Sequence, residues 1–393
     1  MKKFFVSQLF RSVFGAAIIV FLALVVVSPL SCRLTEEGIE ILPVDTTAPS
    51  VEDFSVSGAK SVTISCSEKI VLDCICLLEM EEDDDELLFE LLDSGDENLY
   101  AVADSISYSE NRKSAEIEFS EETKVGKIYV FKGKIYDITG NSLDFVQKFY
   151  GYNEKPARLL FNEIRTTYNK SKQAAEYIEF YVLKSGNTFG LELVSGANGE
   201  SKKYVFPAME VSQGEFIVVH GRIFDESADI ALDELSDDLS LSSAYESSDT
   251  ARDLWKAGND KIASNSDVLV LRDSLSLDIK DAVLLSAAGK TEWSKKTMSE
   301  FAQTAYDKGI WAGGAGPLNA ICTEGMSSSL LRSISRQNRS ELAEKYQDTS
   351  CLPEYILSAA SDWIVTEKMT VDKLVISGAT PGYENSRNPY ETK

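Results

Sequence analysis

The 393-residue sequence has a single histidine, His220, and lacks the short motifs that mark common catalytic centres. It contains no G-x-S-x-G nucleophile elbow, and its glycine-rich stretch 311–317 has no Lys-Ser/Thr pair of a phosphate loop. No cysteine–histidine spacing fits zinc. Because no acid, base and nucleophile come together in the sequence, we expect a protein that is not an enzyme and that needs no cofactor.

Positive charge is also scarce. The chain has 39 Lys and Arg against 63 Asp and Glu, a net charge of −24. A nucleic-acid binder needs a basic footprint that displaces counterions from phosphates, so nucleic acid is excluded as a partner. The same charge disfavours direct electrostatic adhesion to anionic lipid. Apolar residues make up 44% of the chain, which is enough to fill the cores of two or three domains.

The longest apolar run lies at the N-terminus, after a basic start. Residues 13–27 are all apolar or small, a length at the upper end for a signal peptide and short for a membrane span. The stretch ends at Ser31-Cys32, which resembles a bacterial lipoprotein signal, although Pro29 stands where an aliphatic residue is usual. The resemblance implies a signal peptide over residues 1–31 and lipid attachment at Cys32. Plain secretion and an uncleaved anchor helix remain as alternatives.

Five cysteines lie beyond this segment, in a chain whose export permits disulfides. An odd number leaves at least one thiol free or paired between chains. We expect Cys322 and Cys351, both in the C-terminal part, to form a disulfide. The pairing of Cys66, Cys74 and Cys76 stays open, because two cysteines on one strand face cannot easily bridge.

The stretch 157–182 predicts two β-strands of a sandwich. Residues 159–164 are apolar on both faces, as in an inner strand. Residues 176–182 alternate, with Ile178 and Phe180 on one face and charged or tyrosine side chains on the other. Many further short strands with turn signals follow, so the sequence predicts an all-β chain.

The N-E-I strand followed by E-Y-I-E-F resembles the opening of the lamin tail domain, an immunoglobulin-like β-sandwich. Further family motifs follow in order: S-L-L-R at 329–332, D-T at 348–349, D-W at 362–363 and T-P-G-Y-E-N at 380–385. One departure is Val182, where the family usually has Asn. The resemblance places a lamin-tail-like domain at residues 157–388, with two insertions near 225–261 and 293–318.

Residues 48–152 carry alternating β segments and resemble the bacterial immunoglobulin-like domains of surface proteins. The resemblance rests on a D-T-T-A-P start, an S-E-K-I segment after a strand and a D-I-T-G-N-S-L turn. Residues 32–47 form a tether before it. The predicted architecture is therefore two immunoglobulin-like β-sandwich domains in tandem after an N-terminal signal and lipoprotein segment.

An acidic run over residues 79–86 interrupts the first of these domains. Clustered carboxylates are calcium ligands, but this run lacks the alternating spacing and the glycine of a calcium loop. A solvated loop is the simpler interpretation. The candidate calcium ligands are Glu81, Glu82, Asp83, Asp84 and Asp85.

The lamin-tail resemblance implies that Arg332 and Asp362 belong to one sandwich, where they would form a structural ion pair or an edge hydrogen bond. Glu163 and Glu179 are a conceivable acid/base couple, but nothing else marks a sugar cleft, so we expect structural roles. Trp311 begins a glycine-rich segment that we expect to be a flexible loop. Ligand contact is its alternative.

Lamin tail domains in bacteria tend to lie in exported or surface proteins, often beside a hydrolase domain, and none is present here. The resemblance therefore implies a non-catalytic, lipid-anchored protein of the bacterial cell envelope, periplasmic or surface-exposed. It would bind or scaffold a protein or another envelope component, with the two insertions as the contact surface. The alternatives are a calcium-stabilised surface adhesin and a hydrolase. The sequence assigns no partner, leaflet or oligomeric state.

Overall fold

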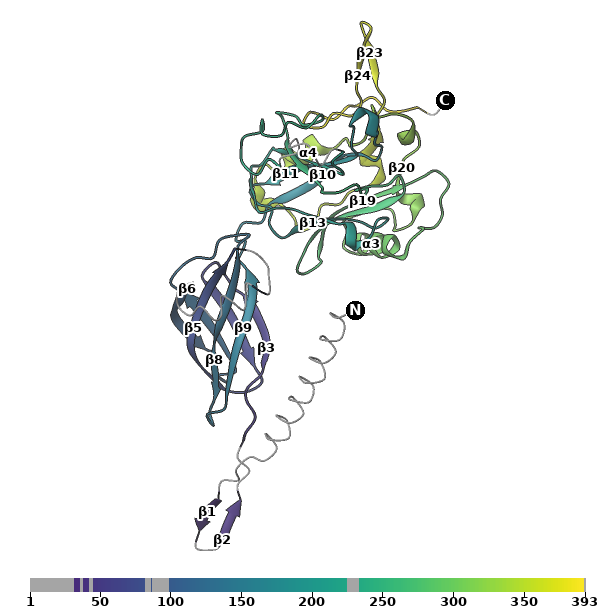
Figure 1. The fold of residues 1–393 in the computed structure, drawn as a ribbon. Coiled ribbons are helices and arrows are strands. Elements are labelled where there is room, and N and C mark those ends of the chain that lie inside the picture. The colour runs from purple at the N-terminus through teal and green to yellow at the C-terminus, as the bar shows by residue number, and fades with distance from the viewer. Residues whose placement is uncertain are drawn as a thin grey trace, which may run out of the picture. The chain divides into compact units, whose positions relative to one another are not determined.

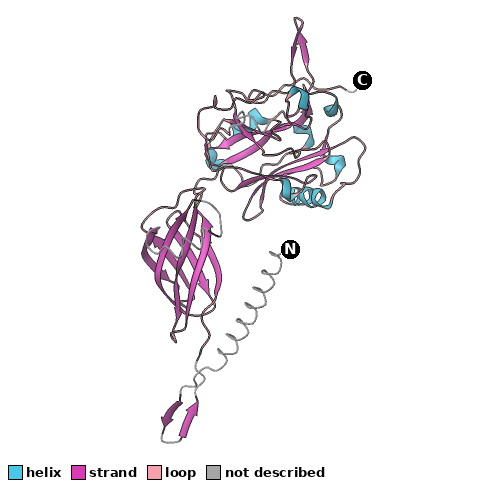
Figure 2. Ribbon diagram, viewed as in Figure 1, coloured by secondary structure: helices cyan, strands magenta, loops and turns pink. Residues whose placement is uncertain are grey.

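The computed structural model describes residues 32–35, 38–41, 45–81, 86, 99–224 and 233–391. Strands dominate them, and the helices whose bounds are described are α3 (Lys296–Asp307) and α4 (Arg339–Lys345), so the predicted all-β class is confirmed (Figure 2). The chain divides into two compact units, Met1–Tyr152 and Asn153–Lys393. Within the described residues, no helix has the length and apolar content needed to cross a membrane.

The N-terminal unit is built on one seven-stranded antiparallel sheet with the order β3-β4-β7-β6-β5-β8-β9 (Figure 1). A separate hairpin of β1 (Cys32–Thr35) and β2 (Gly38–Ile41) precedes it, in the segment that we expected to be a tether. The strands of the sheet are β3 (Val51–Val56), β4 (Ser61–Cys66), β5 (Ile70–Met80), β6 (Leu99–Tyr108), β7 (Ser114–Phe119), β8 (Ile128–Asp137) and β9 (Ser142–Tyr150).

The seven-stranded sheet folds over so that its two ends face each other across an apolar core. Phe54 of β3, at one end of the strand order, lies 5.5 Å from Phe131 of β8 and 5.6 Å from Phe149 of β9, between ring centroids. Buried positions alternate with partly buried ones along β4 and mostly with exposed ones along β7, as the period-2 pattern predicts. Burial of these aromatic and branched side chains is what holds the unit together.

The C-terminal unit is a sandwich of two sheets, with the orders β17-β16-β11-β10-β21-β22 and β14-β13-β18-β19-β20. Most pairings are antiparallel, but β17 joins β16 and β20 joins β19 in parallel. The first sheet contains β10 (Arg158–Arg165), β11 (Tyr177–Lys184), β16 (Phe216–His220), β17 (Arg252–Trp255), β21 (Ile334–Arg336) and β22 (Trp363–Val365). The second contains β13 (Leu191–Ser195), β14 (Tyr204–Val205), β18 (Asp267–Asp273), β19 (Ile279–Ser286) and β20 (Ile321–Cys322).

One apolar cluster fills the space between these two sheets. Phe161 of β10 and Phe180 of β11, 4.8 Å apart between centroids, share it with Leu193, Val270 and Val283 of the facing sheet. The strands that the sequence indicated at 159–164 and 176–182 are thus the central pair of the first sheet. Two small hairpin-like sheets complete the unit: β12 (Gly186–Asn187) with β15 (Glu210–Val211), and β23 (Met369–Val371) with β24 (Leu374–Ile376).

Both predicted insertions supply core structure, which the sequence did not indicate. In the first, β17 extends the six-stranded sheet, and three of its four residues are buried. In the second, α3 buries Met298, Ala302 and Ala305 against the main core. Trp311 is 1% exposed in the same core, so the glycine-rich segment begins with a core anchor rather than with a flexible loop.

Candidate functional site

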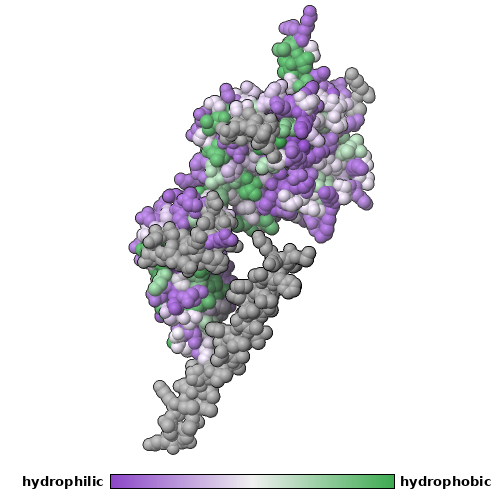
Figure 3. All heavy atoms as spheres, viewed as in Figure 1, coloured by the Kyte–Doolittle hydropathy of each residue, from purple (hydrophilic) through white to green (hydrophobic). Residues whose placement is uncertain are grey.

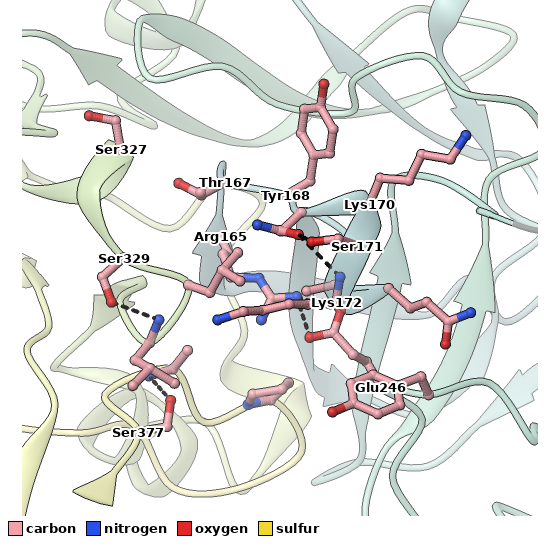
Figure 4. A pocket seen from close by; sticks show the side chains of 18 of the residues that line it. Arg165, Thr167, Tyr168, Lys170, Ser171, Lys172, Glu246, Ser327, Ser329 and Ser377 are labelled. Atoms are coloured by element: carbon pink, nitrogen blue, oxygen red, sulfur yellow. Dashed lines mark hydrogen bonds and ion pairs between the residues drawn. The ribbon is translucent and has the colours of Figure 1, made fainter.

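A polar groove of about 1370 Å³ opens on the C-terminal unit (Figure 4). Three segments far apart in the sequence line it: residues 165–174, 327–331 and 377–381, with Tyr245 and Glu246. Ser171, Ser327, Ser329 and Ser377 contribute hydroxyl groups to the walls. The groove is therefore rich in hydrogen-bonding groups, in contrast to the mostly apolar pockets that take drug-like ligands.

Arg165 at the end of β10 ties the groove to the sandwich. Its guanidinium bonds both carboxylate oxygens of Glu246 at 2.6 Å, and its Nε donates to the Ala175 carbonyl at 3.0 Å. The Ala175 amide donates back to Glu246 at 2.7 Å. Because the Arg165 charge is balanced by a bidentate carboxylate, this pair positions the walls and adds no net charge to the groove.

One wall is the turn that joins β10 to β11. Asn169 caps a 3₁₀ turn, η2 (Lys170–Lys172), by accepting from the Lys172 amide at 3.1 Å. Tyr168 is fixed beside it, because the Arg222 guanidinium lies 3.7 Å above the centre of its ring. The turn thereby places two exposed ammonium groups, those of Lys170 and Lys172, at the groove.

The opposite wall includes the T-P-G segment near the C-terminus. Ser377, Ala379 and Pro381 line the groove. Two amides of this segment point inward: the Thr380 amide donates to Glu163 at 3.1 Å and the Gly382 amide, after Pro381, to Glu179 at 2.5 Å. The two glutamates are thus the anchors of this wall.

Glu163 and Glu179 are fully buried on neighbouring strands, and each is hydrogen-bonded. Glu163 also accepts from Ser335 at 3.0 Å, and Glu179 from Asn162 at 2.5 Å. Burial raises the pKa of both carboxyl groups above the usual value for glutamate, and the nearby charge of Glu163 raises that of Glu179 further. With no exposed oxygen, neither carboxyl group reaches the groove, which agrees with the structural role expected from the sequence.

The charge balance of the groove differs from that of the whole chain. Its charged lining residues are Arg165, paired with Glu246, and the two lysines of η2. Neither lysine has a carboxylate partner among the described residues, so two positive charges stand at this groove on a chain with a net charge of −24. Local positive potential of this kind attracts anions, although the molecule as a whole repels them.

The predicted ion pair between Arg332 and Asp362 is wrong. Arg332 bonds Glu367, with Nε to Oε2 at 3.1 Å, because β22 brings that residue alongside it. Asp362 instead accepts from the Ala359 amide at 2.7 Å and closes the 3₁₀ turn η7 (Ala360–Asp362). Asp362 and Glu367 lie only five positions apart, so spacing in the sequence could not show which of them pairs with Arg332.

The expected disulfide between Cys322 and Cys351 is absent, since both thiols are free and exposed. Cys322 is held in β20 beside Ser286 of β19, whereas Cys351 ends the turn η6 (Thr349–Cys351) that follows α4. Cys66 is also free and buried, and its burial, with the charges of Glu52 and Glu68, raises the pKa of its thiol to about 11.

The remaining cysteines belong to the described residues, whereas four of the five candidate calcium ligands do not. Cys74 and Cys76 form no disulfide. Cys32 lies in β1. Of the candidate calcium ligands only Glu81 belongs to the described residues, where its carboxylate lies 4.0 Å from the Lys127 ammonium. Glu82, Asp83, Asp84 and Asp85 lie outside them.

A different acidic group, Asp45, Glu68 and Asp137, has oxygens within 4.8 Å of one another. Asp137, however, already accepts from Thr139 and Asn141, through both their amides and their side chains. Burial raises its pKa, but these hydrogen bonds outweigh burial and hold it at about 2. The carboxylate therefore fixes the β8–β9 turn.

His220 is buried, and its neighbours bind its Nε2 and one face of its ring, whereas its Nδ1 has no hydrogen-bond partner among the described residues. Its Nε2 lies 2.7 Å from Asp253 of β17, and its ring stacks on Trp255 at 3.9 Å between centroids. Asp253 also accepts from the Ser248 amide at 2.6 Å. The histidine thus joins β16 to β17 inside the unit and is not presented to a substrate.

The groove itself was missed from the sequence. Its one local signal is the polar turn Asn169–Lys172 between two predicted strands, which looks like an ordinary hairpin connection. The walls opposite come from more than 150 residues further along the chain. Only the pairing of β10 with β21, which is not encoded by spacing, brings them together.

The sequence of the C-terminal unit matches a known protein family. Residues 157–365, more than half of the chain, match the family described as TP_1001 protein second domain. An uncharacterized protein of Treponema pallidum (strain Nichols) is 29% identical over 246 residues, which are 59% of this chain and 61% of that relative. The chain thus spans about three-fifths of that relative's length.

Among solved structures, the N-terminal part of the bacterial S-layer protein SbsC aligns with a TM-score of 0.23 and 14% identity, over 61% of this chain and 44% of that one. A DUF4876 family protein from Bacteroides thetaiotaomicron aligns with a TM-score of 0.27 and 11% identity, over 72% and 84%. The family match rests on the sandwich that carries the groove. This chain belongs to the TP_1001 protein second domain family.

Proposed function

We propose that this chain is a non-catalytic, lipid-anchored protein of the bacterial cell envelope, whose C-terminal unit binds an anionic envelope component in the polar groove. The observation that carries the proposal is the turn η2, which sets two exposed lysines at a serine-rich groove on a strongly acidic chain. The binding role keeps the expectation from the lamin-tail resemblance, but of the two insertions only the first contributes to the groove, through Tyr245 and Glu246.

The chemistry of the walls favours a hydroxyl-rich anion, such as a segment of acidic polysaccharide. Lysine ammonium groups act as point charges toward carboxylates or phosphates. Serine hydroxyl groups both donate and accept, and so match sugar hydroxyls. Tyr168 and Tyr245 are 42% and 75% exposed at the rim and supply flat apolar surface for a sugar ring.

The absence of catalysis is supported by where the titratable groups lie. Glu163 and Glu179, the pair that could be imagined as acid and base, are closed off from the groove and hold its wall by hydrogen bonds. A general acid or base must come within hydrogen-bond reach of the substrate. Glu246, the carboxylate that does line the groove, is occupied by Arg165.

Lipid anchoring rests on the N-terminal sequence and is tested separately. A fatty-acid analogue supplied to cells should label the wild type and leave Cys32→Ala unlabelled. Equal labelling of the two would remove lipid attachment at Cys32 from the proposal.

The groove is tested by titrating the full-length chain in detergent with a soluble acidic polysaccharide, polygalacturonate, at about 0.15 M salt. Dextran is the neutral comparison polymer. The double variant Lys170→Glu/Lys172→Glu should lose at least about tenfold in affinity, since it replaces two attractions by two repulsions. The control Lys184→Glu/Lys290→Glu makes the same charge change at exposed sites outside the groove lining.

Two results would contradict the proposal. If both double variants lose affinity equally, binding depends on the net charge of the protein and not on the lysines at the groove. If dextran binds as tightly as polygalacturonate, the lysines do not select the ligand.

A further inference from the structure

The hairpin of β23 and β24 projects from the C-terminal unit with one apolar face uncovered (Figures 1 and 3). Its register pairs Met369 with Ile376 and Val371 with Leu374, which puts these four side chains on one face. They are 39% to 67% exposed. A two-stranded ribbon whose apolar face is uncovered is only marginally stable by itself. Pairing with further strands would therefore stabilise this hairpin.

The edge of β23 can accept such a strand. Asp372 and Lys373 have φ values of 48° and 70°, which makes the connection a two-residue type I′ turn. In such a hairpin the residues flanking the turn, Val371 and Leu374, form a hydrogen-bonded pair. The N–H and C=O of Thr370 therefore point away from β24, toward an edge that has no partner strand among the described residues.

We propose that a second copy of this chain pairs with β23 edge to edge and antiparallel, about a two-fold axis at Thr370. In this register Lys368 of each copy lies next to the turn residue Asp372 of the other, just beyond the paired strands, so the interface contains two opposite-charge contacts. Met369 lies beside Val371 of the other copy, and the apolar strip becomes continuous across four strands. Neither Lys368 nor Asp372 takes part in an ion pair elsewhere in the described part of the chain.

The charges select this register over its neighbours. An axis at Lys368 would put two lysines face to face, and an axis at Asp372 would oppose two aspartates. Pairing through β24, with the axis at Val375, sets Lys373 opposite Ser377 and forms no charge pair. An unpaired edge strand usually carries charged residues, proline or a bulge that block pairing with another chain. The charges near β23 are instead complementary between two copies.

The test is the concentration dependence of the mass of the full-length chain in detergent, measured by sedimentation velocity. The wild type should form a dimer. Lys368→Asp gives a chain with acids at both positions, and Asp372→Lys gives one with lysines at both. Each should raise the dimer dissociation constant at least about tenfold, since attraction becomes repulsion twice in each dimer.

Mixing these two self-repelling chains should restore a dimer, with an affinity within about threefold of the wild type, because every pair across the axis is again opposite in charge. The double variant Lys368→Asp/Asp372→Lys should also dimerise. Exposed Lys184→Asp, outside the hairpin, is the control and should dimerise as the wild type does.

A wild type that stays monomeric at all concentrations would overturn the proposal. So would a dimer that both single variants form unchanged, or a mixture that stays monomeric. A monomer that instead binds neutral phosphatidylcholine vesicles, and loses that binding in Leu374→Ser, would identify a lipid surface as what covers the hairpin and would likewise overturn it.

Discussion

The two units of this chain stabilise their sandwiches in different ways. Among the described residues of the N-terminal unit, the buried polar side chains are only Thr123 and Asp137, and its core is aromatic and aliphatic. The C-terminal unit buries more than a dozen charged side chains besides its apolar core. Arg272, for example, bonds Glu192 at 2.6 Å, and Asp281 accepts from the Phe161 amide at 2.9 Å.

This difference follows from what each unit must hold in place. Neighbouring strands of the N-terminal sheet satisfy one another's backbone groups, so its described part needs few buried polar side chains. The C-terminal unit carries long irregular segments whose amides would otherwise be buried without partners. Its charged groups supply those partners, as Glu163 and Glu179 do for the groove wall.

The largest effect should come from the core anchors. Trp311→Ala should lower the free energy of unfolding of the C-terminal unit by about 3–5 kcal/mol, since it removes a fully buried indole. Phe131→Ala should do the same to the N-terminal unit alone. Hydrogen exchange read by mass spectrometry assigns each loss to its unit. If Trp311→Ala leaves the protection of the C-terminal unit unchanged, the second insertion is not part of its core.

Removing a buried acceptor should cost somewhat less. Glu163→Ala leaves the Ser335 hydroxyl and the Thr380 amide without their acceptor, and should destabilise the C-terminal unit by about 2–3 kcal/mol in chemical denaturation. Glu154→Ala, exposed in the same unit, is the matched control and should be neutral. Equal midpoints for the two variants would show that the groove wall does not depend on Glu163.

The same pair of glutamates makes the stability of the C-terminal unit depend on pH. Because burial raises the pKa of Glu179 in the folded state, its contribution is fully present below the ordinary glutamate pKa and is lost as pH rises through the raised pKa. Glu179→Gln cannot ionise, so its unfolding free energy should fall less steeply with rising pH. The measurement is the slope of the unfolding free energy against pH, compared between the variant and the wild type. A wild-type slope that is no steeper would contradict the raised pKa.

The smallest effects should distinguish two glycines. Gly140 in the N-terminal unit has φ +94° and open space around it, so Gly140→Ala should cost only the backbone strain of about 1–2 kcal/mol. Gly382 has φ +78°, and a Cβ there would lie 2.7 Å from Thr250 Oγ1, so Gly382→Ala should cost more. Gly316, with φ −86° and no neighbour within 4 Å, is the control and should tolerate alanine in a thermal melt.

Where strands alternate or stay apolar, the sequence was sufficient to predict them. The strands predicted at 159–164 and 176–182 both lie in the first sheet of the sandwich, since their patterns report burial directly. The parallel pairings of β17 and β20 were not predicted, because a strand of two or four residues carries no readable period.

The side-chain partners were harder to predict than the strands. Arg332 has Asp362 and Glu367 within a few positions of each other, and only the register of β21 with β22 decides between them. The groove depends on three segments that meet through the fold. Such contacts follow from packing between distant parts of the chain, and composition or spacing cannot specify them.

The distribution of tryptophan gives the two units separate optical signatures. All four tryptophans, Trp255, Trp293, Trp311 and Trp363, lie in the C-terminal unit, whereas tyrosines occur in both. Fluorescence excited at the red edge of indole absorption therefore comes from the sandwich that carries the groove, with no contribution from the N-terminal sheet. Trp255, stacked on His220, is further exposed to quenching by that ring. Tryptophan emission thus follows the unfolding of the C-terminal unit alone, without a label.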